Sequence, residues 1–150
     1  MKIMFTLKPP NGSYGGGAFF VKNLSKYLVQ NGHRITYTLD RDIDVLIIID
    51  PRKCTNNRYS LDDIIKYKNN INPNVKIIHR VNECDIKREV SINLEPSLVK
   101  TMQFADHVIF ISNWLQDYFL NKYNLNIKYS CILNGSNQNF FFPSTNKKLQ

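Results

Sequence analysis

The sequence contains little of what marks several classes of protein. Its 150 residues include only three cysteines, Cys54, Cys84 and Cys131, which lie far apart and form no Cys-x-x-Cys pair. This spacing is not that of a disulfide framework or a zinc site. No apolar stretch approaches the roughly 20 residues of a membrane-spanning helix, and the N-terminus lacks the apolar core of a secretory signal. We therefore expect a protein of the reducing cytoplasm.

Acidic residues are scarce as well, since 12 Asp and Glu stand against 20 Lys and Arg and give a formal net charge of +8. Such a balance is common in proteins that bind nucleic acids. The basic residues are scattered, however, and neither a basic helical stripe nor an aromatic ribonucleoprotein motif is present. We therefore expect no specific nucleic-acid partner. The charge suits small anions or a peripheral contact with acidic membrane headgroups.

Apolar residues make up 43% of the chain, which is enough to fold one domain of ordinary size. Short apolar runs alternate with segments that have helical spacing. Strands are predicted at residues 2–6, 35–39, 44–49, 75–79, 108–111 and 129–133, and helices at 18–30, after Ser60, from Pro96 and after Ser112. This order predicts an α/β fold with three layers and a doubly wound, mostly parallel sheet of about six strands. The Rossmann-like domain would span residues 1–143, with 144–150 as a tail or linker.

Three consecutive glycines, Gly15, Gly16 and Gly17, separate the first predicted strand from the first helix. In doubly wound sheets, ligands bind beyond the carboxyl ends of the strands. Glycines there leave main-chain amides bare at a helix N-terminus, where a phosphate or a sugar hydroxyl can bind. The spacing is not Gly-x-Gly-x-x-Gly, and the Lys-Ser/Thr of a P-loop is missing. A loop that binds nothing is the alternative interpretation.

A dense polar run closes the fourth predicted strand. His79 could transfer a proton near neutral pH, and Arg80 could hold a phosphate or carboxylate through two N–H groups. Asn82, Glu83 and Asp85 follow, and the two carboxylates could orient sugar hydroxyls. The alternative is a surface loop with one half-buried histidine.

Other polar or aromatic groups after strand ends have simpler interpretations. The segment 50–53, Asp-Pro-Arg-Lys, follows the third strand and is more typical of a turn than of a binding site. Ser112 is expected to cap a helix, because no Gly-x-Ser-x-Gly elbow surrounds it. Trp114, Tyr118 and Phe119 on one helix are expected to pack.

Several short motifs follow one another in a characteristic order over almost the whole chain. They are Gly15–Gly17, Asn31-Gly32-His33, His79, the segment Ala105–Trp114, Ile132-Leu133-Asn134-Gly135 and Phe142-Pro143. In this order the sequence resembles the N-terminal, acceptor-side domain of a GT-B glycosyltransferase. It is similar to the large retaining group of that fold that uses nucleotide-sugar donors.

The resemblance implies a function and a partner. The enzyme would transfer a sugar from a nucleotide-sugar to a glycan, lipid or protein hydroxyl, in the cleft between this domain and a second, donor-binding domain. No further cofactor and no metal are implied, because the fold can use protein dipoles and cations. That second domain and its paired-glutamate motif have no counterpart in these 150 residues. We therefore expect the chain to need a donor domain or partner chain and to be inactive alone.

By the same resemblance, Gly15–Gly17 would line the cleft, and His79 would match the histidine that touches the transferred sugar. Arg80 could take that role instead, and Arg80, Asn82 and Glu83 would bind substrate. Two other functions stay open. One is a dinucleotide-binding oxidoreductase. Asp40 after the second strand could be its acidic residue, although the glycines do not have the Gly-x-Gly-x-x-Gly spacing of that class. A non-catalytic α/β binding module is the other alternative.

Overall fold

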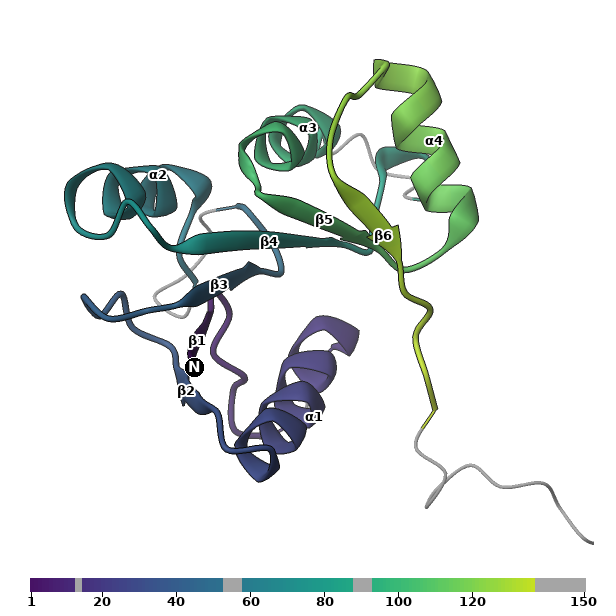
Figure 1. Ribbon diagram of the computed structural model, residues 1–150. Coiled ribbons are helices and arrows are strands. Elements are labelled where there is room, and N and C mark those ends of the chain that lie inside the picture. The colour runs from purple at the N-terminus through teal and green to yellow at the C-terminus, as the bar shows by residue number, and fades with distance from the viewer. Residues whose placement is uncertain (13–14, 53–57, 88–92, 137–150) are drawn as a thin grey trace, which may run out of the picture.

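The computed structural model describes residues 1–12, 15–52, 58–87 and 93–136. Six strands form one sheet in the order β2-β1-β3-β4-β5-β6, and every pair of neighbours is parallel (Figure 1). The predicted α/β fold with a doubly wound sheet of about six strands is confirmed. The elements are β1 (Lys2–Phe5), α1 (Gly16–Gln30), β2 (Arg34–Thr36), β3 (Val45–Ile48), α2 (Leu61–Asn70), β4 (Lys76–Val81), the 3-10 helix η1 (Asp85–Lys87), α3 (Glu95–Phe104), β5 (His107–Phe110), α4 (Asn113–Tyr123) and β6 (Tyr129–Cys131).

The two faces of the sheet are covered unequally. Helix α1 packs on one face, where Val21 joins Ile3 and Phe5 of β1 in a buried core. On the opposite face, Tyr67 of α2 and Met102 of α3 belong to two further buried clusters, and α4 contributes to the second of them. Figure 1 shows α1 alone below the sheet and α2, α3 and α4 above it. Among the described residues, no helix covers β4 to β6 on the α1 face.

The strand β4 continues to Val81, beyond the predicted end at residue 79. It does so because β5 supplies partners: Arg80 lies opposite Ile109, and Val81 lies opposite Phe110. This pairing depends on a strand far along the chain, which the local pattern of residues does not report. His79 and Arg80 therefore lie within the strand. Since successive side chains of a strand alternate, the two point to opposite faces of the sheet.

Two helices, α2 and α4, start where the local signals in the sequence predict, and α3 starts at Glu95, one residue before the predicted Pro96. The hydroxyl of Ser60 accepts the N–H of Asp63, whose carboxylate accepts the N–H of Ser60, so a capping box opens α2. The hydroxyl of Ser112 accepts the N–H of Leu115 and caps α4, as predicted. Helix α1 begins at Gly16, before the predicted start at residue 18. Glycine is a poor helix former, so the helical pattern begins only with the alanine that follows.

A buried carboxylate ties α3 to α4. Glu95 is 2% exposed and accepts hydrogen bonds from Lys122 Nζ at 2.7 Å, from the hydroxyl of Tyr118 at 2.8 Å and from that of Tyr123. It also accepts the main-chain N–H of Asp85 at 2.9 Å. Burial by itself raises the pKa of Glu95, but these hydrogen bonds outweigh it and lower the pKa to about 2.

The aromatic residues of α4 pack largely as predicted. Phe119 is fully buried and stacks on Phe110 with ring centroids 6.3 Å apart. Tyr118 meets the edge of Phe119 and stacks on Trp114 at 5.4 Å. Trp114 itself is 51% exposed. The helix thus buries Phe119 and leaves the aromatic residue of its first turn, Trp114, at the surface.

We expect Glu95→Ala to lower the free energy of unfolding by about 3 kcal/mol, because a shared buried acceptor is lost. Two tyrosine hydroxyls, one ammonium group and one main-chain N–H would lose their partner. Urea denaturation at neutral pH measures the change. The control is Asp117→Ala, which removes an exposed carboxylate from α4, the helix that holds the partners Tyr118 and Lys122, and should change stability by less than about 0.5 kcal/mol. Equal stability of the two variants would contradict the structural role of Glu95.

Candidate functional site

A pocket of about 500 Å³ lies between the amino end of α1 and the carboxyl ends of β1, β3 and β4. In the sheet, β2 lies on one side of β1 and β3 lies on the other. The strand order therefore changes direction between β1 and β3, which is the switch point of the sheet. Doubly wound proteins bind their ligands there. The predicted residues Gly15, Gly16, Gly17, Asn82 and Glu83 all line this pocket. The structure therefore brings together most of the predicted substrate-binding residues.

In the described part of the chain, no side chain caps the N–H groups at the amino end of α1. Gly15 is the N-cap without a side-chain hydrogen bond, and the first turn holds no acidic residue. None of Gly15, Gly16 and Gly17 has a positive φ, and a Cβ at Gly15 or Gly16 would meet no atom within 4 Å. The fold does not demand glycine at these two positions. The open space and bare amides fit the predicted role in binding an anion.

An ionic cluster forms the opposite wall of the pocket. Asp50 accepts two side-chain hydrogen bonds from Arg52, at 2.9 and 2.7 Å, and one from Arg58 Nη1 at 2.5 Å. Burial raises the pKa of Asp50, but the hydrogen bonds and charges of the two arginines outweigh it and hold the pKa below its ordinary value. This wall of the pocket thus holds one carboxylate, that of Asp50, beside the guanidinium groups of Arg52 and Arg58.

The residues of this ionic wall could be predicted only in part from the sequence. The main-chain N–H of Arg52 bonds to the Asp50 carboxylate at 3.0 Å, so the predicted turn at 50–52 is present. The same residues also line the pocket, which a turn alone does not imply. Lys53 lies outside the described residues. Arg58 has no strand end or motif beside it in the sequence. It reaches the pocket because its main chain forms a bridge with Leu7 after β1.

His79 does not line the pocket. It lies opposite Ile48 of β3 and Val108 of β5, on the sheet face that α2 and α3 cover, and is fully buried. Neither ring nitrogen has a hydrogen-bond partner among the described residues. Burial lowers the pKa of His79 to about 3, although the charge of Asp50 acts in the opposite direction. His79 is therefore neutral at physiological pH and has no direct access to a ligand in the pocket.

Arg80 points to the other face of the sheet and lines a second cavity, a groove of about 690 Å³ beside α1. Gly16, Gly17 and Asn82 line both the pocket and the groove. The predicted site is thus divided between two adjoining cavities that share the amino end of α1. Asp85 belongs to neither of them. Its carboxylate accepts the main-chain N–H of Leu94 at 2.9 Å and so serves the start of α3.

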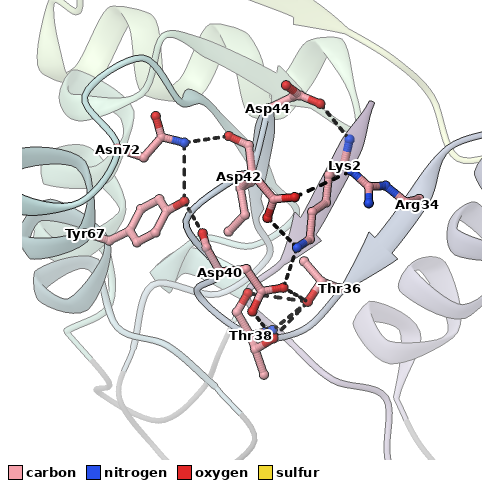
Figure 2. A network of polar contacts seen from close by, with 10 residues as sticks. Lys2, Arg34, Thr36, Thr38, Asp40, Asp42, Asp44, Tyr67 and Asn72 are labelled. Atoms are coloured by element: carbon pink, nitrogen blue, oxygen red, sulfur yellow. Dashed lines mark hydrogen bonds and ion pairs between the residues drawn. The ribbon is translucent and has the colours of Figure 1, made fainter.

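The resemblance implied no metal, yet three alternating aspartates, Asp40, Asp42 and Asp44, have the Asp-x-Asp spacing of a metal motif. Figure 2 shows them around Lys2, at the start of β1, and none of the three lines the pocket. Lys2 Nζ lies 2.7 Å from Asp40 and 2.6 Å from Asp42, and the main-chain N–H of Lys2 donates to Asp44 at 2.7 Å. The carboxylate of Asp40 is therefore engaged at the amino edge of the sheet. This position does not suit the ribose contact of a dinucleotide-binding domain.

Metal-ligating residues do not gather elsewhere in the described part of the chain. No group of three or more His, Cys, Asp or Glu side chains there has a geometry that could hold a metal ion. Cys84 and Cys131 are free thiols, and Cys54 lies outside the described residues. None of the described helices is long and apolar enough to cross a membrane. No protein-family model matches the chain, and no curated protein matches it at a significant level.

The buried position of His79 predicts a pH-dependent stability. Its pKa of about 3 in the folded chain lies below the ordinary 6.5, so the unfolded chain binds the proton first as the pH falls. The stabilisation by neutral His79 is present above pH 6.5 and is lost progressively toward pH 3. Between about pH 8 and pH 5 we expect a loss of about 2 kcal/mol in the free energy of unfolding.

The variant His79→Leu isolates this effect. Urea denaturation at the two pH values should show that it removes most of the loss, because leucine cannot be protonated. His33→Gln, which changes a histidine near the amino terminus, should retain the loss. An undiminished pH dependence in His79→Leu would contradict the assignment to His79.

Proposed function

We propose that this chain is the acceptor-side domain of a glycosyltransferase that uses a nucleotide-sugar donor. One observation carries the proposal: bare helix N–H groups, two guanidinium groups and several carboxylate or amide groups converge on one pocket at the switch point of the sheet. Departure of a nucleoside diphosphate develops negative charge, which N–H groups and arginines stabilise. Carboxylates and amides are suited to hydrogen-bonding sugar hydroxyls. The order of motifs that resembles the GT-B fold supports the same function.

The proposal assigns a role to each wall of the pocket. Gly16 and Gly17 at the amino end of α1, with Arg58, would face the diphosphate. Arg58 suits this role because it lines the pocket, where Asp50 holds its guanidinium group in place and the side chain stays partly exposed. Asn82 and Glu83 would hold sugar hydroxyls. His79 is too deeply buried to touch the sugar, so we assign direct contacts to the pocket-lining residues instead.

Sugar transfer requires more than this pocket. A reaction of two substrates needs both held in alignment and screened from water. We propose that a donor-binding domain, in the same polypeptide or in a partner chain, supplies the second wall. The 150-residue chain would then bind the diphosphate portion of a donor weakly and transfer no sugar. Mass-spectrometric detection of a glycosylated product made by the 150-residue chain alone would contradict this division of labour.

Arg58→Met tests the anion-binding wall. We expect it to weaken binding of inorganic diphosphate and of nucleotide-sugars by about tenfold or more, because a hydrogen bond between charged groups is lost. Isothermal titration calorimetry with a panel of uridine, guanosine and thymidine diphosphate sugars measures the affinities. Arg34→Met is the matched control, since Arg34 lies on the edge strand β2 and lines neither cavity. Equal affinities of the two variants would remove Arg58 from the site.

Gly16→Ala tests the amino end of α1. Because a Cβ at Gly16 meets no atom within 4 Å, the thermal unfolding temperature should stay the same or rise slightly, as alanine is the better helix former. The methyl group would crowd the bare amides, and diphosphate affinity should fall about three- to tenfold. Lys26→Ala, on the exposed part of the same helix, is the control for the loss of general positive charge. A loss of affinity in Lys26→Ala but not in Gly16→Ala would identify a diffuse charge effect.

A further inference from the structure

The groove beside α1 is a second cavity with its own chemistry. Its floor is the uncovered part of the sheet, where Ile47, Ile78 and Ile109 are only partly buried. Phe20 and Leu24 of α1 form one wall, and the chain after β6 forms the other. Its volume of about 690 Å³ falls in the range of about 300–1,000 Å³ that is usual for small-molecule sites. The lining is mostly apolar, and its polar side chains are one arginine, at the end beside the start of α1, and the asparagines Asn23, Asn82 and Asn134.

A single buried cation stands at that end. Arg80 is 5% exposed, its Nη2 donates to Asn134 Oδ1 at 2.9 Å, and its guanidinium carbon lies 3.9 Å from the centre of the Phe20 ring. Its Nη1 is buried without a hydrogen-bond partner among the described residues. Burial lowers the pKa of Arg80, and no described acidic residue lines the groove. The guanidinium group thus lacks the anion that a buried charge normally has.

The same end of the groove holds a second positive pole. Gly16 and Gly17, the first residues of α1, line it together with Arg80. The N–H groups at the amino end of a helix carry a partial positive charge. A phosphate group has enough oxygens to accept hydrogen bonds from an arginine and from main-chain amides at once.

We propose that the groove binds a phosphate-headed amphiphile, with its phosphate at Arg80 and the first turn of α1 and its apolar chain along Phe20, Leu24, Ile78 and Ile109. Charge complementarity selects the head, because the groove offers one unpaired cation and no described acidic residue. The apolar walls select the tail, because an inorganic anion would leave them exposed to water. This inference does not depend on the proposed transferase function.

Decyl phosphate is the probe, used as single molecules below its micelle-forming concentration. Isothermal titration calorimetry and two-dimensional NMR of the 150-residue chain should show saturable binding of one molecule, with shifts at Phe20, Ile78 and Ile109. Inorganic phosphate has the head alone and decyltrimethylammonium has the tail with the opposite charge. Both should bind at least tenfold more weakly. Comparable binding of either one would overturn the proposal.

Arg80→Met separates binding from folding. Methionine keeps most of the apolar stem and removes the uncompensated charge, so the unfolding temperature should stay the same or rise, while affinity for decyl phosphate falls at least tenfold. Arg80→Lys, which keeps the charge, should retain more affinity than Arg80→Met and covers the case in which the methionine variant does not fold. Arg34→Met should bind as the unchanged chain does. Unchanged affinity in Arg80→Met, or saturation by an acidic amphipathic peptide but not by decyl phosphate, would overturn the proposal.

Discussion

Adjacent side chains of a strand point to opposite faces of a sheet, and in β4 this constraint falls on the most polar stretch of the chain. His79 and Arg80 are neighbours in sequence, yet one enters the core under α2 and α3 and the other enters the groove beside α1. Both are buried, and both hold polar atoms without partners among the described residues. Their chemical consequences differ, because histidine can become neutral whereas arginine keeps its charge. On the core face, His79 is therefore neutral. On the groove face, Arg80 keeps a positive charge that no described acidic residue of the groove balances.

The amino end of α1 connects the two cavities. Gly16 and Gly17 line both the pocket at the switch point and the groove. Positive charge is thus concentrated at one edge by helix geometry and by Arg52, Arg58 and Arg80. The net charge of +8 says little about this arrangement, since most basic side chains lie elsewhere. The proposed binding of anions at this edge rests on the placement of charge relative to the sheet more than on its amount.

Elements whose signals are local were predictable from the sequence. The alternation of strands and helices follows from the spacing of apolar residues, and the caps at Ser60 and Ser112 are short-range hydrogen bonds. The site was predictable only in part. The extent of β4 depends on its pairing with β5, which decided the faces of His79 and Arg80. Arg58 reaches the pocket through a bridge with Leu7. Such contacts join residues distant in sequence, and no local pattern encodes them.

The strand order carries a consequence for synthesis on the ribosome. From β4 onward, each strand pairs with the strand made just before it, so this part of the sheet can grow in the order in which the chain emerges. Among the six strands, only β1 pairs with two strands that are made after it, β2 on one side and β3 on the other. β1, the strand of this sheet that is made first, therefore joins β2 to the other four strands. Loss of β6 would leave a continuous sheet of five strands, whereas loss of β1 would separate β2 from all the others.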